Sequence, residues 1–186
     1  MKSSSKVIAL SGVMGALTFV VMFLESYVFT ILIPLAPPCF LSLSLAITLS
    51  LAGEKKYMFI GGTVMGVCSL VVALIIGNPV FILPWISILP RIFIGIVAFF
   101  VSKLFQIIFK KTNNKFLKNY LPASIGAILG VITNTVLVLT MMFICNFVGI
   151  EGIIATFMAI NFPIEVAASA IIVPVLVNTL KRFNRG

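Results

Sequence analysis

The basic residues of this chain fall into four short patches that are separated by long apolar runs. Twelve of the thirteen Lys and Arg residues lie in these patches, at 2–6, 55–56, 103–118 and 181–185. Lys and Arg collect on the cytoplasmic side of membrane proteins, and the length between patches suits one apolar excursion out and back. The pattern predicts an all-α membrane protein, a bundle of six transmembrane helices with both termini cytoplasmic. Arg91 is then the one cation on the outer side.

Composition agrees with a protein that lies in lipid. The 186 residues are 61% hydrophobic and 9% charged, whereas the surface of a soluble domain must be largely polar. The length suits one domain covering 1–186. We interpret the net charge of +9 as a cytoplasmic-side signal that also attracts anionic membrane lipid, and not as a nucleic-acid site.

Several kinds of chemistry are excluded by what the sequence lacks. The chain has no His, which removes His-based triads and His metal sites. Cys39, Cys68 and Cys145 do not have metal-ligand spacing. No P-loop motif for ATP occurs. We therefore predict no metal, no cofactor and no enzymatic activity.

Apolar length divides the chain into spans, because a transmembrane helix needs about 20 apolar residues. The second span is short, and a re-entrant segment is the alternative there. A segment that failed to cross would place Lys55 and Lys56 outside, so we predict a crossing. Two further apolar stretches, 80–89 and 153–160, are predicted to dip into the membrane, and polar residues 110–120 connect the two halves. The predicted spans are 7–33, 39–52, 57–76, 89–109, 121–146 and 164–180.

Charged residues within the spans gather at one depth. Counting 1.5 Å per residue from the inner boundary places Glu165 at roughly 23 Å, and Arg91 and Glu25 at roughly 28 Å. Asn78 and Asn161 fall in the outer loops. Because polar groups are costly in hydrocarbon, the cluster predicts a pocket that opens outward. The alternative is a structural ion pair, or side chains that extend to the interface.

Two more residues belong to this prediction. Asn134 lies near mid-depth, roughly 20 Å from the inner boundary. Trp85 lies between Pro84 and Pro90, where it suits a lid over the pocket or a position in the aromatic belt of the interface.

Small residues recur on the cytoplasmic half of the first span, as Ser11-x-x-x-Gly15 and Gly12-x-x-x-Ala16. This spacing lets helix backbones approach closely. It suits docking of a partner or packing inside the bundle, and the glycines at 61, 62 and 66 suit the same purposes.

Three stretches resemble a known family. Asn-Pro at 78–79 followed by I-L-P-R-I-F-I-G at 88–95 is similar to an N-P…L-P-R-x-x-x-G pattern. T-N-T-V-L-V-L at 133–139 resembles a fifth-span motif, and N-F-P-I-E at 161–165 with I-I-V-P at 171–174 resembles a last span. The family is the substrate-binding S components of energy-coupling factor (ECF) vitamin transporters, of the pantothenate and pyridoxine/hydroxymethylpyrimidine types.

The resemblance implies a binding subunit of an ABC importer in the bacterial cell membrane. Such a subunit captures a vitamin outside and delivers it inward together with a T component and two ATPases. In the first span the family usually carries Ala-x-x-x-Ala for docking on the T component, and Ser11, Gly12, Gly15 and Ala16 stand there in this chain. The implied ligand-binding residues are Asn78, Trp85, Arg91, Asn134, Asn161 and Glu165.

The residues do not decide which vitamin is bound. Arg91 suits the carboxylate of pantothenate, whereas Trp85 suits stacking on pyridoxine or hydroxymethylpyrimidine. We favour pantothenate because one outer Arg suits an anion. The alternative from another functional class is a six-span structural or assembly membrane protein. Such a protein would explain the topology but not the outer polar cluster.

Overall fold

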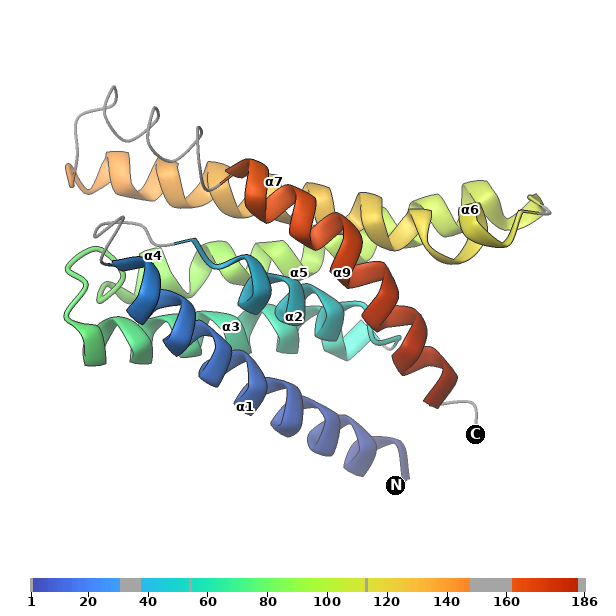
Figure 1. The fold of residues 1–186 in the computed structure, drawn as a ribbon, viewed down its shortest axis with the longest axis horizontal. Coiled ribbons are helices and arrows are strands. Elements are labelled where there is room, and N and C mark those ends of the chain that lie inside the picture. The colour runs from blue at the N-terminus through green and yellow to red at the C-terminus, as the bar shows by residue number, and fades with distance from the viewer. Residues whose placement is uncertain (1, 31–37, 54, 113, 148–161, 184–186) are drawn as a thin grey trace.

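The computed structural model describes residues 2–30, 38–53, 55–112, 114–147 and 162–183, and these residues form a bundle of helices (Figure 1). Its long helices are α1 (Lys2–Thr30), α3 (Lys55–Ile76), α5 (Leu89–Ile108), α7 (Leu121–Ile144) and α9 (Phe162–Phe183). Five segments, one in each long helix, have the length and apolarity to cross a membrane. The predicted all-α membrane architecture is therefore confirmed. The predicted dipping segment 153–160 and Asn161 lie outside the described residues.

Helix α2 (Phe40–Ser50) differs from the predicted span 39–52. Its 11 residues extend about 17 Å, which is too short to cross a hydrocarbon core of about 30 Å. Eight of the 11 residues are buried, and the neighbours of α2 include α1, α3 and α9. The helix runs back toward the end of the bundle where α1 begins (Figure 1). It is shorter than a span because it is enclosed by protein, where a backbone needs no contact with lipid.

The burial of α2 explains its many hydroxyl side chains. The Oγ atoms of Ser44 and Ser50 and the Oγ1 atom of Thr48 donate to carbonyl oxygens four residues earlier, over 2.6 Å, 2.9 Å and 2.7 Å. The Oγ atom of Ser44 also lies 3.0 Å from that of Ser169 on α9. Because each hydroxyl has a partner, α2 can be both polar and central.

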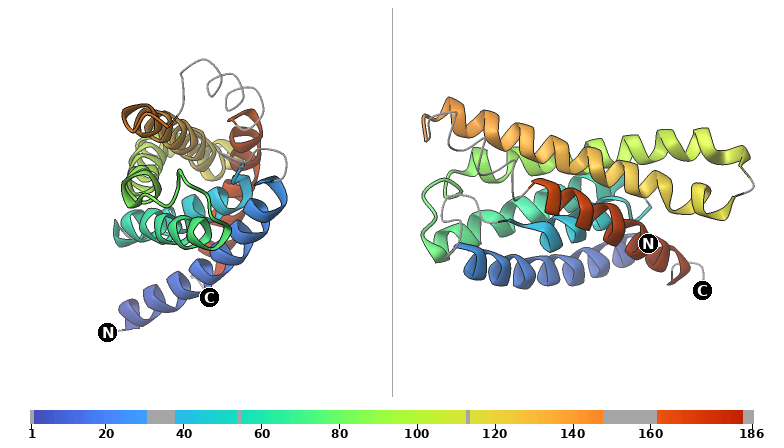
Figure 2. Two further views of the ribbon diagram at one scale, coloured as in Figure 1. Left: turned by 90° about the vertical axis from the view of Figure 1, so that its left-hand side faces the viewer. Right: turned by 45° about the horizontal axis from the view of Figure 1, so that its top comes forward.

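The two ends of the bundle differ in the segments that they carry. The start of α1, the end of α2, the end of α9 and the tip between α5 and α7 lie toward the right-hand end in Figure 1, and the right-hand view in Figure 2 agrees. The start of α2, residues 77–88 and the start of α9 lie toward the opposite end. The described residues of the four basic patches thus share one end of the molecule, as the sequence predicts. We refer to it as the basic end.

The orientation in the membrane stays a prediction. Because Lys and Arg favour the cytoplasm, the basic end should face inward. We expect a thiol reagent that cannot cross membranes to label Cys at position 85, at the far end, in intact cells. Position 114, at the basic end, should be labelled only after the membrane is permeabilised. Both variants need a background without the three native cysteines, and labelling of position 114 in intact cells would contradict the topology.

Candidate ligand-binding pocket

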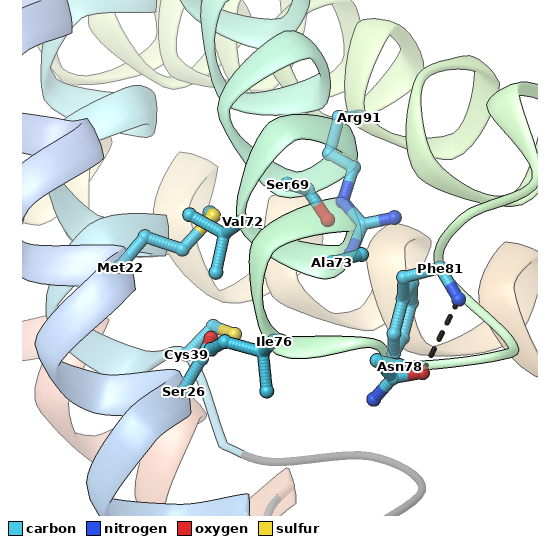
Figure 3. A pocket seen from close by; sticks show the side chains of 10 residues that line it. All are labelled: Met22, Ser26, Cys39, Ser69, Val72, Ala73, Ile76, Asn78, Phe81 and Arg91. Atoms are coloured by element: carbon cyan, nitrogen blue, oxygen red, sulfur yellow. Dashed lines mark hydrogen bonds between the residues drawn. The ribbon is translucent and has the colours of Figure 1, made fainter.

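A pocket lies between α1, α3, α5 and the start of α2, at the end opposite the basic end (Figure 3). The volume enclosed within it is about 20 Å³, which is enough for a water molecule but not for a vitamin. A ligand of vitamin size therefore needs the walls of the pocket to move apart or must extend into its open mouth. Its lining residues are Met22, Ser26, Cys39, Ser69, Val72, Ala73, Ile76, Asn78, Phe81 and Arg91.

Arg91 supplies the positive charge of this pocket and is only 4% exposed. Its Nη1 atom donates to the carbonyl oxygen of Ile86 over 2.7 Å, and its guanidinium carbon lies 4.9 Å from the centre of the Phe81 ring. Its Nε atom is buried and has no hydrogen-bond partner. Within the described residues, no ion pair joins Arg91 to a glutamate. A buried cation in this state favours an anion as its missing partner.

Asn78 fixes the chain next to Arg91. Its Oδ1 atom accepts hydrogen bonds from the backbone N–H groups of Val80 over 3.1 Å and of Phe81 over 3.3 Å, as in an Asx turn. Gly77 before it has a φ of 81°, a conformation that glycine adopts without strain. This turn directs the chain back to the bundle and places Phe81 against the guanidinium of Arg91 (Figure 3).

The rest of segment 77–88, which includes α4 (Pro84–Ser87), packs firmly on the bundle. Val80 and Ile86 are fully buried and form a cluster with Val138 and Met142 of α7. The Oγ atom of Ser87 donates to the carbonyl oxygen of Phe81. The segment therefore forms a well-packed wall of the pocket. It does not form another span, in agreement with the sequence.

Two glutamates hold the first residues of α2. Glu25 on α1 accepts from the backbone N–H groups of Leu41 over 2.7 Å and of Ser42 over 3.1 Å. Glu165 on α9 accepts from the backbone N–H of Cys39 over 3.1 Å. Negative groups stabilise a helix N-terminus because its first N–H groups lack intrahelical partners. Both glutamates thus hold the start of α2, and Glu165 bonds directly to Cys39, which lines the pocket.

Buried polar atoms without partners coincide with predicted site residues. In the part of the chain that the structure describes, four such side-chain atoms occur, and three belong to Arg91, Asn134 and Glu165. The fourth is the Oγ atom of Ser11. Buried polar groups are nearly always satisfied in native proteins, so each exception needs an explanation. A polar ligand or ordered water is the simplest partner for the three that lie away from the basic end.

The structure brings together part of the predicted site. Arg91 and Asn78 line the pocket, and Glu165 is one hydrogen bond from it through Cys39. Asn134 is buried on α7 but is not part of the lining. Trp85 is also outside the lining, with 51% of its side chain exposed. The structure therefore does not place Trp85 where a lid residue would contact the ligand.

Sequence reasoning missed several lining residues. Ser26 and Ser69 are polar residues in otherwise apolar runs at the depth of Arg91, a signal that was available. Phe81 was hidden among the apolar residues of the dipping segment. Met22 has no distinguishing sequence feature, since apolar residues also fill the rest of its span.

The small residues of α1 separate onto two faces. Gly12 and Ala16 are exposed, and a Cβ atom at Gly12 would meet nothing within 4 Å. Gly15 faces α3, because its carbonyl oxygen lies 3.9 Å from the Sγ atom of Cys68 and a Cβ atom there would lie 3.2 Å from Val64. Of the two predicted motifs, Gly12-x-x-x-Ala16 thus leaves a free surface, whereas Ser11-x-x-x-Gly15 includes a position that packs inside the bundle.

Comparison with known proteins identifies the family. The chain is 31% identical over 160 residues to the pantothenic acid transporter PanT of Lactococcus lactis subsp. cremoris (strain MG1363), and the match covers 77% of this chain and 75% of that protein. The chain belongs to the PanT family of S components. It is a multi-pass cell-membrane protein of a transport system and not an enzyme. No family model matches the chain, and no solved structure does.

Close helix packing at Gly62 sets the position of Arg91. A Cβ atom at Gly62 on α3 would overlap the carbonyl oxygen of Arg91 on α5. We expect Gly62→Ala to destabilise the protein by about 1–3 kcal/mol, the usual cost of overpacking, and to weaken ligand binding because Arg91 must shift. Gly12→Ala is the matched control, since nothing lies near that position. Thermal unfolding and ligand affinity of the purified chain measure both effects, and equal behaviour of the two variants would contradict this account.

Proposed function

We propose that this S component binds pantothenate from outside the cell and delivers it inward together with an ECF T component and two ATPase subunits. The observation that carries the ligand is Arg91, a buried cation in the pocket without an ion-pair partner among the described residues. Pantothenate is a small anion with hydroxyl groups and an amide. Its carboxylate matches the guanidinium, and its hydroxyl and amide groups match Ser26 and Ser69, the polar hydroxyl residues of the pocket lining.

Two further observations support pantothenate over pyridoxine or hydroxymethylpyrimidine. The relative from Lactococcus lactis is a pantothenic acid transporter by name. The aromatic alternative relies on Trp85 as a stacking partner, and that side chain is half exposed outside the pocket lining. The aromatic ring in the lining, Phe81, is already covered by the guanidinium of Arg91.

The exposed face of α1 supports the proposed docking on a T component. Gly12 and Ala16 lie one turn apart on a helix that is mostly unburied in the bundle. Small residues at this spacing let another helix approach closely. The chain itself has no ATP-binding motif, so the energy for transport must come from partner subunits.

Arg91 provides the sharpest test of the ligand. Loss of a buried charge-assisted contact costs about 2–5 kcal/mol, roughly 30-fold or more in affinity. We expect Arg91→Ala to weaken pantothenate binding at least that much in calorimetry of the isolated chain. Arg91→Lys keeps the charge but cannot form the bidentate fork, so it should recover only part of the affinity.

An analogue of pantothenate without the carboxylate tests the contribution of that group to binding. The alcohol analogue of pantothenate, in which the carboxylate is replaced by a hydroxymethyl group, should bind wild type much more weakly than pantothenate does. Arg91→Ala should bind the two ligands about equally if the guanidinium contacts the carboxylate. If the variant keeps its preference for pantothenate, or binds normally but has a lower thermal stability, Arg91 has a structural role instead.

The two faces of α1 give a second test with an internal control. A Trp at Gly12 or Ala16 would point away from the bundle, so binding by the isolated chain should persist while assembly and vitamin uptake are lost. A Trp at Gly15 would enter the packing against Val64, so folding and binding should both suffer. Uptake in cells and affinity of the purified chain distinguish these outcomes. Normal uptake with Gly12→Trp and Ala16→Trp would exclude this face as the docking surface.

A further inference from the structure

The tip between α5 and α7 is a structured element rather than a plain loop. Beyond α5 the chain forms a 3-10 turn, η1 (Phe109–Lys111), and then the short helix α6 (Lys115–Asn119). Asn114 caps α6 by accepting from the backbone N–H of Phe116 over 2.9 Å. The end of α6 is joined to α9, because the Nδ2 atom of Asn178 donates to the carbonyl oxygen of Asn119 over 3.0 Å. The tip therefore presents its side chains on a fixed scaffold.

This tip concentrates positive charge in a segment whose own sequence carries no carboxylate side chain. The segment carries three exposed lysines, Lys110, Lys111 and Lys118. A fourth, Lys115, lies between them in the sequence. The sequence has no Asp or Glu between residues 55 and 150. Glu25 and Glu165 bond to the start of α2, which lies toward the opposite end of the bundle from the tip (Figure 1). An anionic partner would meet no described negative charge there.

Phe116 and Tyr120 form an aromatic pair beside the lysines of the tip. Phe116 is 60% exposed, and its ring stacks on that of Tyr120, with ring centres 5.6 Å apart and an angle of 13° between the ring planes. Directly before the tip, Ile107 and Ile108 of α5 are 71% and 56% exposed. The lysines thus stand at the edge of an apolar surface that continues into the membrane-spanning part. Aromatic rings beside Lys, at the end of an apolar helix, are typical of the level of lipid headgroups.

We propose that the tip formed by η1, α6 and their lysines is a binding surface for anionic phospholipid, with the lysines on the headgroup phosphate and Phe116 in the acyl boundary. The continuity with the lipid-facing side of α5 favours lipid over a soluble acidic partner. The surface is independent of the vitamin pocket. It anchors the α5–α7 hairpin at the membrane surface, because each lysine near an anionic surface strengthens binding by about fivefold.

The test compares two variants of the full chain with the same net charge. Lys110, Lys111, Lys115 and Lys118 are replaced by Gln in one variant, and Lys2, Lys6, Lys55 and Lys56 in the other, so that each falls from +9 to 9 − 4 = +5. Native mass spectrometry counts the phosphatidylglycerol that each protein retains from mixed phosphatidylglycerol and phosphatidylcholine nanodiscs. The tip variant should retain at least about tenfold less phosphatidylglycerol, while the control stays close to wild type.

Two further measurements, in high salt and with a Phe116 variant, complete the test. Wild type should lose phosphatidylglycerol in high salt, because exposed charge interactions are screened, and this arm needs no variant to fold. Phe116→Ser should lower retention without changing the charge. Equal losses in the two charge variants, or none, would overturn the proposal, as would a tip variant that keeps its lipid but fails to assemble with the ATPase subunits. Vitamin binding by the tip variant should be unchanged, so failure here is separable from failure of the proposed function.

Discussion

The hydrogen bonds from the start of α2 to Glu25 and Glu165 are the interaction on which the half of the structure opposite the basic end depends. Helix α2 lies inside the bundle, where water cannot satisfy the free N–H groups at its N-terminus. Glu25 accepts from Leu41 and Ser42, and Glu165 accepts from Cys39. These bonds join α1, α2 and α9 at one level. They also fix Cys39 in the wall of the pocket, so that helix capping and pocket shape have a common cause.

Because both glutamates are engaged at α2, Arg91 is left for another role. An ion pair would neutralise the only cation away from the basic patches, and none is formed in the described part of the chain. Arg91 is held instead by the carbonyl oxygen of Ile86 and the ring of Phe81. Neutral partners orient a guanidinium without cancelling its charge. The fold thus keeps a positive charge in a small pocket, at the cost of an unsatisfied Nε atom.

Charge pattern and apolar length were sufficient to predict most of the fold. The four basic patches predicted that the segments carrying them share one end of the bundle. The predicted bounds of the long spans lie within a few residues of the ends of the observed helices. The length of α2 could not be predicted, because an apolar run looks alike whether lipid or protein surrounds it. Arg91 and Asn78 were found because polar residues at that depth are rare. The role of Glu25 depends on hydrogen bonds from Leu41 and Ser42 on another helix, which spacing alone does not specify.

A densely packed apolar core lies beneath the pocket. Met22 and Ser69 line the pocket, and one turn deeper on α3 lies Met65, which is 1% exposed. Met65, Met22, Leu43, Ile47 and Ile94 belong to one buried apolar cluster. Such cores are packed as densely as organic crystals, and a polar vitamin would lose its hydrogen bonds in crossing them. Passage of a polar ligand from the pocket to the basic end through the centre of the bundle would therefore require the helices to separate.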